Sequence, residues 1–218
     1  MRIVISAGPT REPIDPVRFL SNRSTGRMGY ALASAAVKRG WETILVSGPV
    51  ALAAPEGLAG LVRVETAADM AEAMKREAQN ADCIIMCAAV ADYRPVKVAE
   101  RKLKKSDGGM VLELEPTEDV LLSLGRIKRS GQLLVGFAAE TDAVETYALD
   151  KLKRKNLDWI AANRVGVPGE GFESETNAVV LFSRRGEKIV LPLDSKEKIA
   201  GQILERILPD GRRQGDRL

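Results

Sequence analysis

Short, mostly apolar runs alternate with helix-like segments over the first half of the chain. Arg2–Ala7, Trp41–Val46 and Cys83–Ala89 are such runs, and residues 26–40 between the first two have a small-residue helical pattern bounded by glycines. Continuous apolar strands are typical of parallel sheets that helices cover on both faces. The order of these elements predicts an α/β fold that is Rossmann-like, with a doubly wound, mostly parallel sheet.

Capping residues and turn signals predict the remaining elements. The further predicted helices are 66–79, 117–128, 142–155 and 195–208, opened by Thr66, Thr117, Asp142 and Ser195. The further predicted strands are 61–65, 111–114, 132–136 and 159–162, and 159–162 is the last clear strand of the main sheet. Residues 177–182 and 188–191 predict a C-terminal β-hairpin extension with a turn at 183–186. We expect a single domain over 1–208, followed by a frayed polar tail at 209–218.

The chain contains no histidine, which excludes catalytic triads, zinc sites and pH switches that need an imidazole. Its chemistry must use carboxylates, Lys, Arg, amides, backbone dipoles or a metal that arrives with a substrate. The two cysteines, Cys83 and Cys87, are four residues apart in one apolar run, so we expect reduced core residues of a cytoplasmic protein. No run reaches the roughly 20 apolar residues of a membrane span. The net charge of +3 is too small to predict nucleic-acid binding.

The unusual segments all follow predicted strands. They are residues 8–29, 90–105, 137–141 and those from 163 onward. In open parallel sheets, ligands bind outside the carboxyl ends of the strands, where the strand order reverses. We therefore expect these segments to meet at one ligand cleft.

The loop after the first strand, GPTREPIDPVRFLSNRSTGRMG, leads directly into a helix. Glycines and hydroxyls at a helix N-terminus, here including Ser24 and Gly26, suit an anion such as phosphate. An ordinary N-cap by Ser24 or Thr25 is the alternative. Asn22 is a candidate to orient a carboxylate or acyl group, and Arg18 to bind an anion. Either side chain could instead tie the loop by a hydrogen bond.

Two basic segments and two single residues complete the candidate site. Residues 93–109 are rich in Lys and Arg, so we expect a mobile surface loop: a Lys-rich lid beside a phosphate cleft, or simply a solvated face. Lys151 and Lys155 share one helix face, where they contact either a ligand or the negative end of the helix dipole. Asp92, at a strand end, can accept from a ribose hydroxyl or a base, and Phe137 packs on a base or in the core.

At these residues the chain resembles phosphopantothenoylcysteine synthetases, the synthetase half of bacterial bifunctional coenzyme A biosynthesis proteins. The loop above, CAAVADYRP, KLKK, GFAAET and KLKRKNLDWIAAN carry the resemblance, which spans about Arg2 to Leu208. It implies a CTP-dependent phosphopantothenate–cysteine ligase that joins L-cysteine to 4′-phosphopantothenate through an acyl-cytidylate, with Mg²⁺ carried by the nucleotide and no metal ligand from the protein. It also implies a homodimer, with the hairpin at 177–191 as our candidate for part of the interface. FMN is expected only with an upstream decarboxylase domain, so the chain is either free-standing or an excised domain.

The resemblance also assigns site residues by position. It implies catalytic roles for Asn22, at the acyl-cytidylate, and for Lys102, as a lid lysine. The substrate-binding residues it implies are Arg18, Ser24, Gly26 and Ala88. The nucleotide-binding residues it implies are Met86, Cys87, Ala88, Asp92, Lys102, Glu118, Asp119, Val120, Leu121, Phe137, Lys151 and Lys155. Glu118 stands where the family often has proline.

Two other functions stay open. A Rossmann-type NAD(P) reductase would need a complete glycine fingerprint and an acidic residue after the second strand, which here ends Val46-Ser47-Gly48. A non-catalytic nucleotide-binding module would fit the Lys/Arg clusters. The aromatic content of 4% leaves little for base stacking, and we expect neither nucleic acid nor a membrane as partner.

Overall fold

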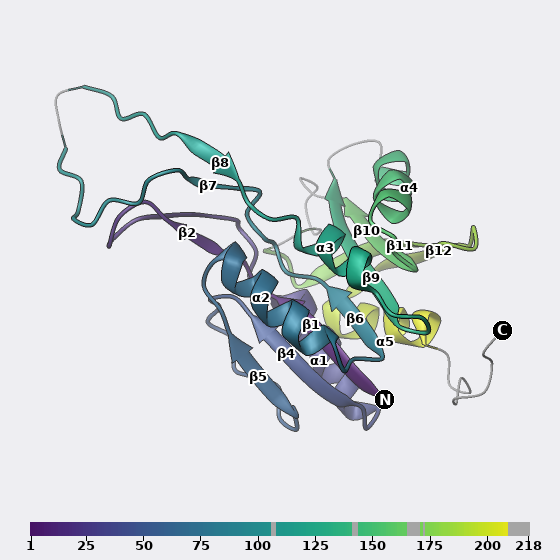
Figure 1. Ribbon diagram of the computed structural model, residues 1–218. Coiled ribbons are helices and arrows are strands. Elements are labelled where there is room, and N and C mark those ends of the chain that lie inside the picture. The colour runs from purple at the N-terminus through teal and green to yellow at the C-terminus, as the bar shows by residue number, and fades with distance from the viewer. Residues whose placement is uncertain (106–107, 141–143, 165–170, 172, 209–218) are drawn as a thin grey trace.

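The computed structural model describes residues 1–105, 108–140, 144–164, 171 and 173–208. One large sheet has the strand order β12-β11-β10-β9-β6-β1-β4-β5, and helices cover both of its faces (Figure 1). Its strands are β1 (Arg2–Ala7), β4 (Glu42–Ser47), β5 (Gly60–Arg63), β6 (Cys83–Met86), β9 (Leu133–Glu140), β10 (Trp159–Arg164), β11 (Thr176–Ser183) and β12 (Lys188–Ser195). The helices are α1 (Arg27–Lys38), α2 (Ala67–Ala78), α3 (Val120–Ile127), α4 (Val144–Arg154) and α5 (Lys196–Ile207).

The strands from β5 to β10 across the sheet are parallel to their neighbours. The chain runs from β1 outward to β4 and β5, then returns to β6 on the other side of β1. The strand order therefore reverses between β1 and β6. The predicted doubly wound, mostly parallel fold is confirmed.

Each face of the sheet has its own apolar core. Leu32 of α1 and Ile203 of α5 are fully buried in the core on one face, and α1 packs directly against α5. Met70, Leu124 and Leu152, from α2, α3 and α4, are buried in the core on the other face. Among the described residues, every helix is too short or too polar to cross a lipid bilayer.

The predicted C-terminal hairpin belongs to the main sheet and extends it beyond β10. β11 pairs antiparallel with β10, and β12 pairs antiparallel with β11. The physical reason is burial: Val179 and Leu181 of β11 lie in the same core as Ile199 and Ile203 of α5. The hairpin extends the sheet because α5 would otherwise have no strand to cover. The predicted cap of α5 is confirmed, since the Ser195 hydroxyl accepts from the Lys198 N–H.

Two small ribbons stand where loops were expected. β2 (Arg11–Pro13) pairs with β3 (Phe19–Ser21), and β7 (Tyr93–Pro95) pairs with β8 (Leu114–Pro116). The segment Tyr93–Pro116, called the arm below, extends away from the sheet (Figure 1). The expected strand 111–114 is therefore displaced to β8, because its partner β7 fixes the register.

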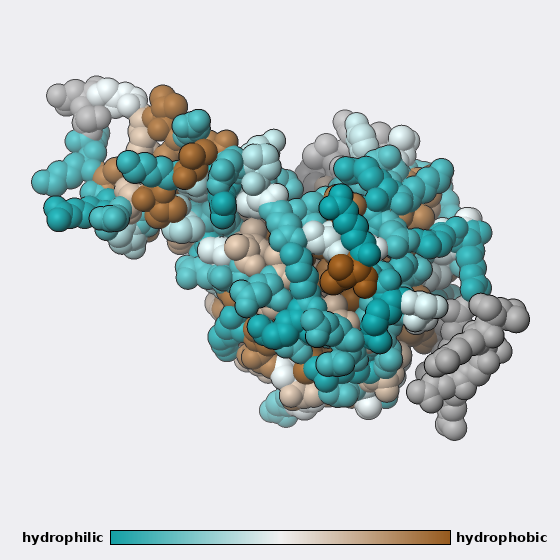
Figure 2. All heavy atoms as spheres, in the orientation of Figure 1, coloured by the Kyte–Doolittle hydropathy of each residue, from teal (hydrophilic) through white to brown (hydrophobic). Residues whose placement is uncertain are grey.

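Apolar side chains gather on the arm, and Figure 2 shows them as brown patches at its base and along its length. The exposed ones include Val98, Met110 and Val111, of which Val111 is 94% exposed. The arm thus carries the expected lysines and also an exposed apolar surface, which its basic composition did not predict.

Candidate functional site

The carboxyl ends of β1 and β6 meet at the point where the strand order reverses. Beyond β1 and β6 the backbone stays paired: the Ala89 N–H donates to the Gly8 carbonyl at 2.9 Å, and the Thr10 N–H donates to the Ala89 carbonyl at 3.2 Å. These bonds hold the two following loops side by side. A cleft of about 440 Å³ opens at this edge, which lies within the size range of small-molecule sites.

Ser6, buried near the end of β1, shapes this edge. Its hydroxyl accepts from the N–H groups of Cys87 and Ala88, both at 3.0 Å. These N–H groups therefore turn away from the ladder, and β6 ends at Met86 rather than at Ala89 as predicted. Sequence analysis passed over Ser6, although a hydroxyl in an apolar strand must find a partner.

Asn22 lies at the mouth of the cleft. Its Nδ2 donates to the Ala89 carbonyl at 3.0 Å, and the neighbouring Ser21 hydroxyl donates to the Thr10 carbonyl at 2.7 Å. The alternative of a loop-tying bond is thus observed for Asn22. The same bond fixes its amide group against the backbone beside Ala88, within the cleft lining.

The N-terminus of α1 opens into the cleft with no side-chain cap. Gly26 is the N-cap, with a φ of 78°, and its N–H donates to the Ser24 hydroxyl at 3.3 Å. The alternative, an N-cap by Ser24 or Thr25, is therefore not what the structure shows. A Cβ at Gly26 would lie 2.8 Å from the Val50 side chain and 3.3 Å from the Gly8 backbone, so the close approach of Gly8, just after β1, disfavours a larger residue. An uncapped helix N-terminus favours an anion.

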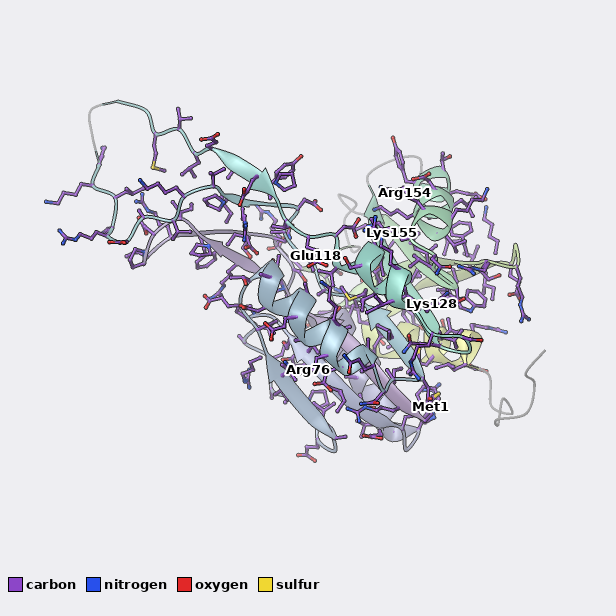
Figure 3. The ribbon with its side chains drawn as sticks, viewed as in Figure 1. Met1, Arg76, Glu118, Lys128, Arg154 and Lys155 are labelled. Atoms are coloured by element: carbon purple, nitrogen blue, oxygen red, sulfur yellow. The ribbon has the colours of Figure 1, made fainter. Side chains whose placement is uncertain are left out.

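The opposite wall of the cleft comes from α3 and the end of α4. Asp119 caps α3 by accepting from the Leu122 N–H at 3.0 Å, and it also forms a 2.8 Å ion pair with Lys155. Burial acts to raise the pKa of Asp119, but the bonds from Lys155 and Leu122 more than offset it and hold the pKa below its usual range. Figure 3 shows Lys155 at the end of α4 beside the start of α3.

The helix predicted to begin at Thr117 begins three residues later, at Val120. The Thr117 hydroxyl donates to the Ala91 carbonyl at 2.5 Å, and its N–H donates to the Asp92 carbonyl at 2.9 Å. Thr117 therefore ties the strand end that carries Asp92 and cannot cap the helix. Glu118 pairs with Lys75 of α2, whose hydrogen bond lowers the pKa of Glu118. The predicted capping residue Asp142 of α4 lies outside the described residues.

The cleft gathers every predicted site residue except Arg18 and Lys102. Those that line it are Asn22, Ser24, Gly26, Met86, Cys87, Ala88, Asp92, Glu118, Asp119, Val120, Leu121, Phe137, Lys151 and Lys155. Arg18 directly precedes β3, and Lys102 directly precedes Leu103 on the arm. The Arg18 guanidinium donates to the Leu103 carbonyl at 3.0 Å and to Asp15. Arg18 thus binds the arm in this structure, and Lys102 stands outside the cleft lining.

The cysteines differ from each other. Cys83 is fully buried and Cys87 partly buried, and both are free thiols. Cys83 is a core residue as predicted, whereas Cys87 lines the cleft. Burial raises the pKa of the Cys87 thiol to about 12, against the opposing charge of Lys196, so this thiol is neutral near pH 7.

Sequence analysis missed a polar group at the other end of the cleft: Arg27, Asn163, Asn177 and Lys196. One signal was available. Lys196 is the first residue of α5, and a cation at a helix N-terminus opposes the helix dipole. A lysine in that position indicates a role other than helix stability.

The fold and cleft define a doubly wound α/β domain with its candidate ligand site at the switch point of the sheet. The family model described as "DNA/pantothenate metabolism flavoprotein C-terminal domain" matches residues 1–209. The chain belongs to this family.

The relatives are bifunctional proteins. The coenzyme A biosynthesis bifunctional protein CoaBC of Bacillus subtilis (strain 168) is 52% identical over 215 residues, which cover 99% of this chain and 53% of that protein. CoaBC of Escherichia coli (strain K12) is 45% identical over 211 residues, covering 95% of this chain and 52% of that protein. The chain spans about half the length of these curated relatives.

Solved structures agree on the fold. The crystal structure of the C-terminal domain of CoaBC superposes with a TM-score of 0.80 at 48% identity, covering 94% of this chain and 93% of that one. A Cab2 mutant, H337A, in complex with phosphopantothenate-cysteine has a TM-score of 0.77 at 18% identity and covers 94% of this chain and 85% of that one. The second match supports the fold alone.

Proposed function

We propose that this chain is a CTP-dependent phosphopantothenate–cysteine ligase of coenzyme A biosynthesis. The observation that carries the proposal is the switch-point cleft, which brings Asn22, the N-terminus of α1 and Lys155 to one cavity. Membership of the pantothenate-metabolism family supports it, as do the coenzyme A biosynthesis relatives. The absence of histidine fits a reaction in which the nucleotide activates the acid.

In the first proposed step, a carboxylate oxygen of 4′-phosphopantothenate attacks the α-phosphorus of CTP. The bond from that phosphorus to the bridging oxygen breaks, giving an acyl-cytidylate and pyrophosphate. Lys151 and Lys155 would offset negative charge on the phosphates, and Asp92 would accept from the ribose. The uncapped α1 N-terminus at Gly26 would hold an anionic group of the acid.

In the second proposed step, the amine nitrogen of L-cysteine attacks the acyl carbon. The bond from this carbon to the CMP oxygen breaks, the nitrogen loses one proton, and phosphopantothenoylcysteine and CMP leave. The Asn22 amide, held against the Ala89 carbonyl, would orient the acyl group for this attack without adding charge.

Two cofactors enter this proposal differently. The described residues contain no group of three or more acidic or cysteine side chains that could hold a metal ion, and Glu118 and Asp119 are paired with lysines. We therefore assign Mg²⁺ to the CTP substrate. FMN would belong to a decarboxylase domain in a fused protein, in keeping with the length of the bifunctional relatives.

Pyrophosphate release tests the proposal. We expect release with CTP only when 4′-phosphopantothenate is present, and conversion to phosphopantothenoylcysteine when L-cysteine is added. CTP binding without pyrophosphate release would favour the non-catalytic module, and reduction of a substrate by NAD(P)H would favour the reductase. The same assay with ATP measures the strictness for CTP.

A further inference from the structure

A second polar end of the cleft lies on the face of the sheet that α1 and α5 cover. Its central residue is Lys196, which is 3% exposed and donates from Nζ to the Gly171 carbonyl at 2.9 Å. Burial lowers the pKa of Lys196, and the Arg27 charge lowers it further. A cation that is buried and placed at the positive end of a helix is costly. The Lys196 ammonium lines the cleft, so its positive charge can attract an anionic group of a ligand.

Asn177 is the second feature of this end. It is 3% exposed, lines the same cleft, and its Oδ1 has no hydrogen-bond partner among the described residues. Buried acceptors without a donor are rare and costly. This oxygen therefore suits a ligand that brings an N–H group.

A cation and a vacant acceptor together match a ligand that carries a carboxylate and an amine. We propose that Lys196 and Asn177 form the binding site for the amino-acid substrate, with Lys196 on the α-carboxylate and Asn177 Oδ1 accepting from the amine. The inference rests on the proposed function, because it gives that reaction a site for its second substrate. A phosphate group fits less well, since the Asn177 oxygen and the Gly171 carbonyl would face its negative charge.

The position suits the attack of an amine on the acyl group. Cys87, which lines the cleft together with Lys196, is the residue before Ala88. Ser6 fixes the backbone here, and Asn22 donates to the next residue, Ala89. The Asp119–Lys155 pair comes from α3 and α4, on the opposite face of the sheet. An amino acid at Lys196 would thus approach from the side away from the nucleotide. The nearby ammonium also favours the neutral, nucleophilic form of the incoming amine.

Lys196→Met tests the carboxylate contact by comparing L-cysteine with cysteamine, the same amine without the carboxylate. We expect kcat/KM for cysteine to fall about 10- to 100-fold, the range of a charge-assisted hydrogen bond, and kcat/KM for cysteamine to change less than threefold. Lys198→Met is the matched control, since its side chain is 69% exposed on the same helix, and it should leave both values unchanged. An equal loss for both amines would overturn the assignment.

Asn177→Leu tests the amine contact separately. Removing an acceptor that has no partner should leave the melting temperature unchanged or raise it, while the KM for cysteine rises about tenfold. A rise in the KM for 4′-phosphopantothenate instead would assign this end of the cleft to the acid and overturn the proposal.

Pyrophosphate release from CTP, measured with 4′-phosphopantothenate and without any amine, separates the two proposals. If the wild-type protein releases no pyrophosphate under these conditions, the proposed function fails and the inference fails with it. If release is normal and both variants keep wild-type values for cysteine, the inference alone fails.

Discussion

At the residue scale, one buried carboxylate ties the arm to the loop after β1. Asp15 accepts from the N–H groups of Val17 and Arg18, from the Arg18 guanidinium and from the Leu103 N–H. The Arg18 guanidinium also donates to the Leu103 carbonyl. The N–H and the carbonyl of Leu103 are thus both hydrogen-bonded, and Lys102 is the residue before it. Asp15 and Arg18, which do not line the cleft, therefore fix the part of the arm that carries Lys102.

Asp15→Asn is expected to loosen this attachment, because an amide cannot accept from all these donors. We predict a lower melting temperature and slower ligation, because the loosened arm carries Lys102. The Arg18 hydrogen bond holds the pKa of Asp15 well below its usual range, so its contribution is present above about pH 4 and is lost as the pH falls further. The difference in melting temperature between wild type and variant should therefore shrink below about pH 4. Glu100→Gln, an exposed change on the same arm, is the control.

Asn22→Asp is expected to slow the second step. A carboxylate would lose the bond to the Ala89 carbonyl, repel that oxygen and add negative charge near the phosphates. We predict at least a tenfold fall in phosphopantothenoylcysteine formation, on the order of one lost positioning contact, with accumulation of acyl-cytidylate measured by quenched-flow analysis. Asn80→Asp, the same change at an exposed position, should have no effect. Unchanged turnover in Asn22→Asp would remove Asn22 from the mechanism.

At the element scale, close backbone approaches set the width of the cleft. A Cβ at Gly29 of α1 would lie 2.5 Å from the Ala7 Cβ, and one at Gly125 of α3 would lie 2.1 Å from the Lys155 carbonyl. These contacts press α1 onto β1 and α3 onto the end of α4. The positions of the α1 N-terminus and of the Asp119–Lys155 pair follow from them.

Two Gly→Ala changes in helices should therefore have opposite effects. Gly125→Ala must move α3 from the end of α4, so we predict a loss of roughly 1–3 kcal/mol of unfolding free energy and a higher KM for CTP. Gly201→Ala, with no atom within 4 Å of the new Cβ, should stabilise by roughly 0.5–1 kcal/mol. Urea unfolding measures both. A stable Gly125→Ala variant with normal CTP kinetics would contradict the account of α3 and α4.

At the scale of the whole molecule, two features of the arm would be explained if a second copy of the chain bound to it. Val111 and Met110 are exposed on it, and Lys102 stands outside the cleft lining. The edge strand β12 also exposes Val190, at 64%, and Leu193. Large exposed apolar groups in clusters are typical of interaction surfaces. Both regions are candidates for the homodimer interface that the family resemblance implies.

We predict that light scattering gives a mass of about twice 23.6 kDa, as expected if two chains associate as a symmetric dimer. Val190→Asp should dissociate the dimer if the hairpin forms part of the interface, and Val111→Asp if the arm does. A dimer that survives Val190→Asp would remove the hairpin assignment, and a monomeric wild type would remove the dimer.

Much of the fold and of the candidate site follows from the sequence. The apolar runs at β1, β4 and β6 set a parallel sheet because strands buried on both faces admit few polar residues. Residues placed after such strands had to meet at one edge, which is why Asp92 and Phe137 were predicted together with Asn22. The capping box at Thr66 and the cap at Ser195 are local hydrogen bonds and were predicted correctly.

Only the tertiary structure decided the rest, since it depends on partners far along the chain. Ser6 ends β6 through hydrogen bonds to residues about 80 positions away. Thr117 does not cap α3 because its hydroxyl donates to the Ala91 carbonyl. The hairpin joins the sheet because α5 lies over it. Lys196 and Asn177 come together with α1 through the same packing. Local pattern determined which elements form, and long-range contacts determined where they end and which side chains share the cleft.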